Sequence, residues 1–257
     1  MLKDIKEYVK NKKEAIKNTI EDHRYQPSLL IIQTGDNEAS NRYVKNKIKD
    51  YQEVGIIADV FKCDENQDVT SINYKISEIG KIYTGIMVQL PTTIPHPNRF
   101  IQNHQDVDGF INPDIDPCTP KGIIDYLAYC GYEDFSGKTV LIINRSEIVG
   151  KPIAKMFLDR NATTIIAHSK TANLTELIAA ADIIITAVGK ANFITKEMIH
   201  ENQIVIDVGI NFDENGKLCG DCEKGIGPNV TPVPGGVGLL TRVALLENIL
   251  ELRKRGR

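Results

Sequence analysis

Tyr43 and Lys47 are side chains whose types and spacing could do chemistry. They lie four residues apart in a stretch, Ser40 to about Val54, whose pattern predicts a helix, so the two side chains share one face, with Ser40 one turn earlier. A lysine near an amide, and near another cation or an apolar surface, can have its ammonium pKa lowered enough to exchange protons close to neutral pH. Lys47 is therefore a candidate general acid/base, although the helix alone would favour two ordinary surface side chains.

Two polar segments that follow predicted strands supply possible partners for this lysine. The next strand after the helical stretch ends in Gln89-Leu90-Pro91, and a later loop contains Asp106-Val107-Asp108-Gly109-Phe110. Open α/β sheets bind their ligands at strand ends and in the adjoining loops. The amide of Gln89 and the carboxylate of Asp108 are therefore candidates to complete a site with Lys47.

A second candidate site follows the strand predicted at Val140 to Ile143. This strand runs into Asn144-Arg145-Ser146-Glu147-Ile148-Val149-Gly150-Lys151-Pro152, after which an apolar periodicity predicts a helix. A phosphate could meet backbone N–H groups at such a helix N-terminus. Only Gly150 remains of the usual three-glycine dinucleotide fingerprint, so an ordinary strand–helix turn is the alternative.

The end of the next strand bears on which dinucleotide would bind. The strand predicted at Thr164 to Ala167 ends in His168-Ser169-Lys170-Thr171, where an NAD enzyme often places an acidic residue for the ribose hydroxyls. Arg145 and Ser169 could instead hold a 2′-phosphate, which favours NADP over NAD as the cofactor. Arg145 could also be solvated or bind the pyrophosphate.

The elements that must position these residues alternate between short β-rich runs and longer amphipathic ones, which indicates an α/β fold. Apolar runs of this kind suit parallel strands covered on both faces. The predicted strands are Leu29 to Ile32, Ile57 to Phe61, Ile86 to Leu90, Val140 to Ile143, Thr164 to Ala167, Ile183 to Ala187 and Ile204 to Val208.

The length of 257 residues suits one large or two modest domains. Six prolines between residues 90 and 121 indicate an ordered loop region that lines a site, and a fresh strand–turn–helix unit begins at Phe135. We expect a catalytic domain at 1–122 plus 239–257, with the last helical run, Leu239 to Arg253, packed back on it. The Rossmann-type nucleotide domain is expected at 123–238.

Composition excludes several classes of protein. The net charge of −3 gives no case for nucleic acid or an anionic membrane as partner. The charged first residues and the absence of a long apolar run predict a cytoplasmic protein.

The five cysteines are an odd number and are expected to be reduced. Cys219 and Cys222 have redox or zinc spacing, but no second pair or nearby His completes a metal site, so we expect no metal.

The chain closely resembles the bifunctional methylenetetrahydrofolate dehydrogenase/cyclohydrolase family along nearly its whole length. Several separated motifs occur in order, and together they are highly specific. They are Ser40-x-x-Tyr43-Val44-x-x-Lys47, Val88-Gln89-Leu90-Pro91, Asp106-Val107-Asp108-Gly109, Pro117-Cys118-Thr119-Pro120-Lys121-Gly122, Arg145-Ser146-x-Ile148-Val149-Gly150-Lys151-Pro152 and Thr231-Pro232-Val233-Pro234-Gly235-Gly236-Val237-Gly238.

The resemblance implies a two-domain subunit, usually a homodimer, with a tetrahydrofolate derivative in a cleft between an N-terminal α/β catalytic domain and a Rossmann-type NADP-binding domain. It makes Lys47 the essential acid/base, Tyr43 the residue that stacks on or orients the pterin, Gln89 the partner of the lysine and Asp108 the anchor of the pterin's polar edge. Substrate contacts are also implied for Leu90 and for Pro234, Gly235 and Gly236. The implied cofactor-binding residues are Asn144, Arg145, Ser146, Ile148, His168, Ser169, Thr171, Val188, Gly189, Gly209 and Ile210.

The implied chemistry is two steps in one cleft: hydride transfer from the folate methylene group to the nicotinamide, then hydrolysis of the methenyl product to 10-formyltetrahydrofolate, with Lys47 more important for hydrolysis. Three positions depart from the family pattern: Asn144 replaces a glycine, Thr92-Thr93 replaces Leu-Pro, and Leu239-Leu240 replaces Pro-Met. A family member with one activity, or a non-catalytic folate- or nucleotide-binding module, is the alternative.

Overall fold

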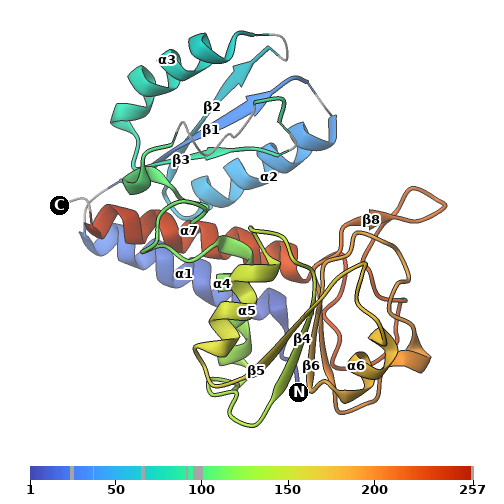
Figure 1. Ribbon diagram of the computed structural model, residues 1–257. Helices are drawn as coiled ribbons and strands as arrows, with labels where there is room; N and C mark the ends of the chain where they lie inside the picture. Colours follow the sequence, from blue (N-terminus) through green and yellow to red (C-terminus); the bar gives the residue numbers. More distant parts are fainter. Residues whose placement is uncertain (24–25, 37, 65–66, 91, 95–100, 256–257) are drawn as a thin grey trace. The chain divides into compact units, whose positions relative to one another are not determined.

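The computed structural model describes residues 1–23, 26–36, 38–64, 67–90, 92–94 and 101–255. The chain divides into two compact units (Figure 1). The first unit consists of Lys10–Cys118 and Arg242–Arg257, and the second unit consists of Met1–Val9 and Thr119–Thr241. Each unit contains its own parallel sheet, so the predicted α/β fold in two domains is confirmed.

The sheet of the first unit has the order β2-β1-β3, and all its strands are parallel. The central strand β1 alternates its apolar side chains between two buried clusters. Leu29 and Ile31 pack with side chains of α1, α2 and α7, whereas Leu30 and Ile32 pack with Ile72 and other residues on the α3 side. The elements are α1 (Ile5–His23), β1 (Ser28–Thr34), α2 (Glu38–Glu53), β2 (Ile57–Cys63), α3 (Val69–Ile79), β3 (Gly85–Val88) and α7 (Val237–Arg255), with short 3-10 helices η1 (Gly80–Ile82) and η3 (Asn103–Gln105).

The sheet of the second unit has the order β5-β4-β6-β7, again with parallel pairing throughout. From β4 the chain passes to β5 on one side and then crosses to β6 on the other, which is the topology that creates a ligand site at the carboxyl ends of the strands. The elements are α4 (Cys118–Tyr129), β4 (Thr139–Ile143), α5 (Gly150–Leu158), β5 (Thr163–Ala167), α6 (Leu174–Ala180), β6 (Ile183–Thr186), η4 (Lys196–Met198), β7 (Ile204–Asp207) and an antiparallel hairpin of β8 (Asn211–Phe212) and β9 (Leu218–Cys219).

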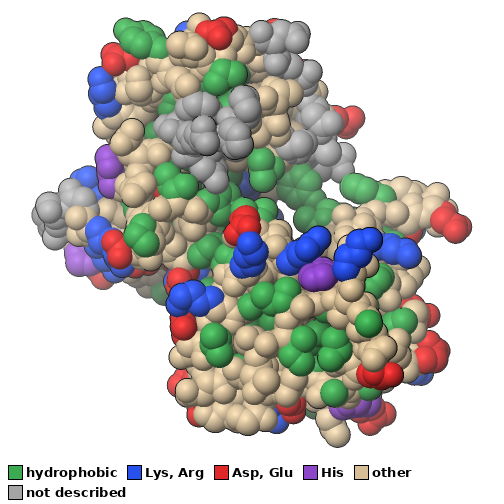
Figure 2. All heavy atoms as spheres, viewed as in Figure 1, with side chains coloured by type: hydrophobic (Ala, Val, Ile, Leu, Met, Phe, Trp, Pro, Cys, Tyr) green, Lys and Arg blue, Asp and Glu red, His purple; other side chains and the backbone are tan. Residues whose placement is uncertain are grey.

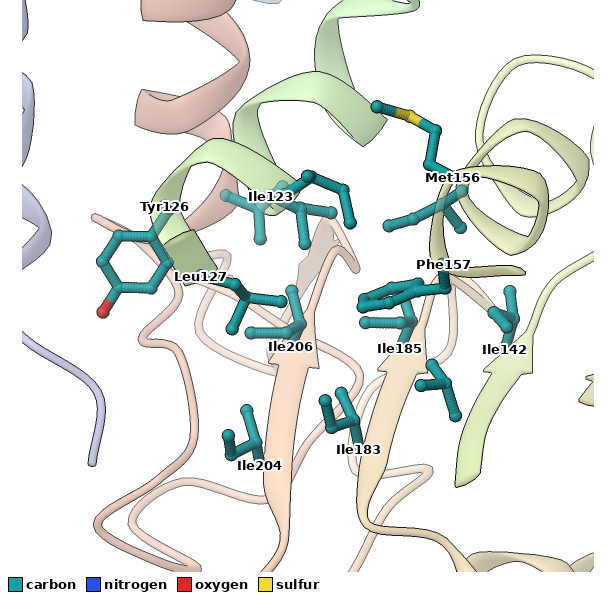
Figure 3. Close-up of a cluster of buried hydrophobic side chains, with 14 of the residues drawn as sticks. Ile123, Tyr126, Leu127, Ile142, Met156, Phe157, Ile183, Ile185, Ile204 and Ile206 are labelled. Carbon is teal, nitrogen blue, oxygen red and sulfur yellow. The ribbon is translucent and has the colours of Figure 1, made fainter. Parts of the chain in front are cut away.

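Alternate side chains of this sheet face two different clusters. Ile142 and Ile185 point into the cluster shown in Figure 3, where they meet Phe157 of α5 and Leu127 of α4. Leu141 and Ile143 of β4 point to the other face, where they meet Ile184 of β6 and Ile178 of α6. Burial on both faces explains why these strands read as continuous apolar runs in the sequence.

All seven predicted strands are present, with small shifts at their ends. The strand expected at Ile86 to Leu90 ends at Val88, so Gln89 and Leu90 follow the strand instead of closing it. Helix α1 and the β8–β9 hairpin were not predicted. The proline-rich stretch ends in helix α4, which begins at Cys118, while the part of that stretch at 91 and 95–100 lies outside the described residues.

The observed division of the chain differs from the expected boundaries at the N-terminus. The first nine residues belong to the second unit, because Ile5 and Tyr8 are buried in its core and Tyr8 packs edge-on against Tyr126 with ring centroids 5.7 Å apart. At the other end, Arg242–Arg257 belongs to the first unit.

Phe157 provides a test of the second unit's core. Its side chain is fully buried and meets Phe135 edge-on at 4.9 Å between ring centroids, so we expect Phe157→Ala to lower the free energy of unfolding by about 3–5 kcal/mol. The neighbouring Leu158 is 59% exposed, and Leu158→Ala should cost less than about 0.5 kcal/mol. Urea unfolding followed by circular dichroism measures both; equal midpoints for the two variants would contradict this packing.

Candidate active site and nucleotide-binding edge

Lys47 lies on α2 in the first unit and is partly buried against the end of β3. Its Nζ donates a hydrogen bond to Oε1 of Gln89 at 3.0 Å and lies 3.8 Å from Sδ of Met87. Tyr43, one turn earlier on the helix, is 41% exposed. The predicted Tyr-Lys edge therefore exists, with an accessible aromatic face beside a lysine that has been drawn toward the sheet.

The position of Gln89 follows from the parallel sheet. Its backbone N–H continues the ladder beyond β3 by donating to the carbonyl of Ile32 at 2.8 Å. Its side-chain Nε2 donates to the carbonyl of Leu90 at 2.6 Å, which directs Oε1 toward Lys47. Leu90 itself is 46% exposed, so an apolar surface adjoins the lysine and its amide partner.

Burial lowers the pKa of the Lys47 ammonium, because the charged form loses water. The carboxylate of Asp108 and the thiol of Cys118 oppose this shift, and the guanidinium of Arg242 reinforces it. The balance favours a neutral amine more than at an exposed lysine. Such a group can both accept and return a proton under mild conditions.

Asp108 is held near Lys47 by a loop that a different carboxylate organises. The buried Asp106 accepts hydrogen bonds from the backbone N–H groups of Gly109 at 3.1 Å, Ile111 at 2.7 Å and Asn112 at 3.0 Å. Burial raises the pKa of Asp108 to about 6; the Lys47 ammonium opposes the rise and the Asp106 carboxylate adds to it. A lysine with a lowered pKa and an aspartate with a raised pKa therefore interact electrostatically in the first unit.

Arg242 and Asp50 are residues near Lys47 that the sequence did not single out. Asp50 lies on α2 three residues after Lys47, is 5% exposed, and pairs with Arg242 of α7 and with Lys13 of α1 at 2.7 Å. Arg242 also donates to the carbonyl of Asn46 at 3.4 Å. The sequence carried no signal for this pair, because it joins α2 to α7, which are far apart in the chain.

In the second unit, the turn after β4 has the features of a phosphate site. The hydroxyl of Ser146 accepts from the N–H groups of Val149 at 3.2 Å and Gly150 at 3.4 Å, which leaves its own O–H to be donated outward. Arg145 is exposed beside it. Figure 2 shows lysine, arginine and histidine side chains gathered on a face of this unit, which suits an anionic ligand.

Asn144, the departure from the family's glycine, uses its side chain inside the protein. Its amide donates to the carbonyl of Ala187 at 2.6 Å and its oxygen accepts from the N–H of Ser146 at 2.8 Å. This links the end of β4 to the end of β6. Gly150 is required opposite it, because an added Cβ would lie 2.3 Å from the carbonyl oxygen of Asn144.

The remaining expected cofactor residues lie just beyond the carboxyl ends of the strands of the same sheet, or in the turn after β4. His168, Ser169 and Thr171 follow β5, and the Thr171 hydroxyl accepts from the backbone N–H of His168 at 2.9 Å. Val188 and Gly189 follow β6, while Gly209 and Ile210 follow β7. Apolar side chains among these residues are unusually exposed, with Ile148 at 39%, Val188 at 39% and Ile210 at 60%.

Pro234, Gly235 and Gly236 belong to the second unit and immediately precede α7; their role as substrate contacts stays a prediction. All five cysteines are free. Among the described residues, no cluster of three or more His, Cys, Asp or Glu side chains could hold a metal ion. In the same part of the chain, no helix is both long enough and apolar enough to cross a membrane.

A sheet with a dinucleotide-type edge, together with a second α/β unit that carries a desolvated lysine, is the arrangement expected of a pyridine-nucleotide-linked enzyme. Two family models match the chain: the tetrahydrofolate dehydrogenase/cyclohydrolase catalytic domain over residues 2–114 and the NAD(P)-binding domain of the same family over residues 117–257. The chain belongs to this family, and the resemblance inferred from its motifs is confirmed.

Named relatives agree with this assignment. The bifunctional protein FolD of Lysinibacillus sphaericus is 40% identical over 246 residues, covering 88% of this chain and 86% of its own. The crystal structure of bifunctional FolD from Campylobacter jejuni superposes with a TM-score of 0.93 at 36% identity, covering 100% of this chain and 99% of that one. The Trypanosoma brucei enzyme, solved with NADP and an inhibitor, gives a TM-score of 0.90 at 27% identity, with coverage of 100% and 98%.

Gly150→Ala tests the phosphate turn. The added methyl group would collide with backbone, so we expect the dissociation constant for NADP to rise at least about tenfold, because the N–H groups of the turn must move. Gly238, near the start of α7, has open space where a methyl group would be added, so Gly238→Ala is the matched control. Isothermal titration of NADP into both variants decides; unchanged affinity in Gly150→Ala would remove the turn from the cofactor site.

Proposed function

We propose that this protein oxidises 5,10-methylenetetrahydrofolate to 5,10-methenyltetrahydrofolate with NADP and hydrolyses the product to 10-formyltetrahydrofolate. Both halves of the chain match the family that carries these activities. The observation that carries the second activity is the desolvated Lys47, which donates a hydrogen bond to Gln89 and interacts electrostatically with the carboxyl group of Asp108. A module that only bound folate or nucleotide would not need a lysine prepared for proton transfer.

In the hydrolytic step, water adds to the methenyl carbon and loses a proton, which the neutral amine of Lys47 would accept. The bond from that carbon to N5 then breaks, N5 takes up a proton, and the added hydroxyl loses its remaining proton to solvent as the carbonyl of the formyl group forms on N10. Lys47, oriented by the Gln89 oxygen, can return the proton it accepted. The positive charge of the substrate leaves as one proton, so atoms and charge balance.

The other site residues serve binding. Tyr43 offers an exposed aromatic ring on which a flat pterin could stack, and Leu90 an adjoining apolar surface. A carboxyl group at Asp108, with a pKa raised to about 6, can accept from or donate to the pterin's polar edge. The placing of the folate between the two domains stays a prediction, as does the homodimer.

A bound NADP would supply the hydride acceptor for the methylene carbon. The chain's part in that step is to orient and to stabilise charge, since no proton is transferred. Exposed Arg145 and the serine hydroxyls at 146 and 169 supply donors for phosphate groups, and the turn His168 to Thr171 lacks the acidic residue that an NAD enzyme often has.

The deciding experiment compares wild type with Lys47→Met, using Lys45→Met as control because Lys45 lies on the same helix but is exposed. Each is incubated with 5,10-methylenetetrahydrofolate and NADP or NAD, and reduced nicotinamide, methenyl and formyl products are followed separately. We expect hydrolysis by Lys47→Met to fall about 100-fold or more, with a smaller loss of hydride transfer. Methenyl product should then accumulate.

The outcomes separate the alternatives. A wild type that reduces NADP but forms no 10-formyltetrahydrofolate above the uncatalysed rate is a single-function dehydrogenase. Absence of turnover with either cofactor, together with a folate- or NADP-induced rise in melting temperature, would replace the enzyme with a binding module. Equal hydrolysis by Lys47→Met and Lys45→Met would remove Lys47 from the mechanism.

Arg242 gives a prediction about pH dependence. Besides burial, which lowers the pKa of Lys47, three side chains shift it electrostatically: Asp108 in the loop before α4 and Cys118 at the start of α4 raise it, and Arg242 of α7 lowers it. Arg242→Met removes a repelling cation, so the pKa of Lys47 rises. The limb of the hydrolysis pH–rate profile that reports Lys47 should therefore move to higher pH, while Arg242→Lys, which keeps the charge, should retain the wild-type position. An unmoved limb in Arg242→Met would contradict this electrostatic role.

A further inference from the structure

Asp221 is a fully buried carboxylate that the chemistry described above does not use. It lies between Cys219 and Cys222, in the segment that leaves the β8–β9 hairpin, and its exposure is 0%. Its carboxylate oxygens accept five hydrogen bonds. The donors are the backbone N–H groups of Val188 at 2.6 Å, Gly189 at 3.0 Å and Lys190 at 3.0 Å, the hydroxyl of Thr186 at 3.0 Å and the side-chain amide of Asn211 at 3.0 Å.

A second buried carboxylate fixes Asp221 in place. Asp207, the last residue of β7, accepts from the backbone N–H groups of Asp221 at 2.9 Å and Cys222 at 2.8 Å. It also accepts from the N–H of Gly209 at 2.9 Å. Gly209 must be glycine here, because an added Cβ would lie 2.3 Å from an oxygen of Asp221. The sheet edge therefore determines where the Asp221 carboxylate lies.

The hydrogen bonds of Asp221 decide which way the loop after β6 faces. Three successive N–H groups, of Val188, Gly189 and Lys190, turn inward to one carboxylate. Because these three N–H groups donate to Asp221, they do not donate to a phosphate. The turn around Ser146 supplies the phosphate donors instead. The loop instead presents its outer surface at the edge of the sheet, including the side chain of Val188, which is 39% exposed.

Sheet topology shows which half of a dinucleotide this loop would meet. In a doubly wound sheet, the dinucleotide extends across the carboxyl ends of the strands on both sides of the switch point. Here β5 and β6 flank β4 on opposite sides. The His168 to Thr171 turn, with its donors for a 2′-phosphate, follows β5 and would contact the adenosine half of the dinucleotide. The loop after β6 lies on the other side of β4 and would therefore contact the nicotinamide half.

We propose that Asp221 is a positioning residue for the nicotinamide half of NADP: it holds Val188 to Lys190 in the conformation that packs against that half, without contacting the cofactor itself. The inference rests on the proposed use of NADP and adds to it a residue outside the expected cofactor set. It separates the cofactor site into two parts, each organised by a different segment of the chain.

The test uses Asp221→Asn in the full-length protein, because the amide has the same shape but replaces an acceptor oxygen by a donor group that faces the loop's N–H donors. Asp213→Asn is the matched control: Asp213 is exposed on the same hairpin and its carboxylate also accepts backbone N–H groups, from Asn215 at 2.9 Å and Lys217 at 2.8 Å. Isothermal titration measures the dissociation constants for NADP and for 2′,5′-ADP, which has the adenosine half alone.

For Asp221→Asn, we expect the dissociation constant for NADP to rise about ten- to hundredfold while that for 2′,5′-ADP stays within about twofold, because only the loop after β6 has lost its anchor. NAD should weaken by the same factor as NADP, since the 2′-phosphate lies on the other half. In turnover, the KM for NADP should rise more than kcat falls. Asp213→Asn should match wild type in each measurement.

Other outcomes overturn the inference. Equal weakening of NADP and 2′,5′-ADP would show general disruption of the unit, and unchanged NADP affinity would show that the loop does not position the cofactor. If Asp221→Asn does not fold, Thr186→Val, which removes one hydrogen bond from the carboxylate, must give a smaller loss for NADP and none for 2′,5′-ADP. A wild type that binds 2′,5′-ADP and NADP equally tightly also excludes the role, whereas one that binds neither refutes the proposed function instead.

Discussion

Backbone N–H groups that emerge beyond the ends of parallel strands must find acceptors, and in this protein buried carboxylates supply them. Asp106 does so for the loop that carries Asp108, Asp207 for the segment through Cys222, and Asp221 for the loop after β6. A buried charge is costly unless donors surround it, and a loop with unpaired N–H groups is costly unless an acceptor is found. The N–H groups of the loop stabilise the buried carboxylate, and the carboxylate in turn satisfies the N–H groups. These hydrogen bonds restrict the conformations of the loops around both sites.

The same reasoning explains the environment of Lys47. Removal of water favours its neutral amine, whereas Asp108 favours its charged form, and Arg242 is held close by Asp50 and opposes Asp108. No one of these groups determines the protonation state alone. A lysine in such a balance can change its protonation with a small change in its surroundings, such as the arrival of a cationic substrate.

Much of the fold was predictable from sequence because the strands are apolar on both faces and alternate with amphipathic helices. Lys47, Gln89 and the Asp108 loop could be selected because each lies at a helix face or strand end. Asp50, Arg242 and Asp221 could not, because their roles arise from contacts between segments far apart in the chain, such as Asp50 with Arg242. The spacing of Cys219 and Cys222 is typical of metal or redox sites. In the structure, Asp221 between them accepts the hydrogen bonds from the loop after β6. Helix α1 was not predicted, because charged and polar side chains dominate its sequence and only Ile5, Tyr8, Ile16 and Ile20 are buried.

Each unit has its own pair of buried hydrophobic clusters, with Ile31 and Leu30 at the centre of one pair and Ile142 and Leu141 at the centre of the other. No side chain belongs to the clusters of both units, although α1 and α7 contribute different side chains to each, so a point mutation in one cluster removes packing directly from one unit alone. A gene that encodes such a chain can drift toward a single activity by ordinary point mutation, with no need for deletion or fusion. Descendants that specialise would then keep the full length of the chain, and the lost reaction would be visible only in a few side chains.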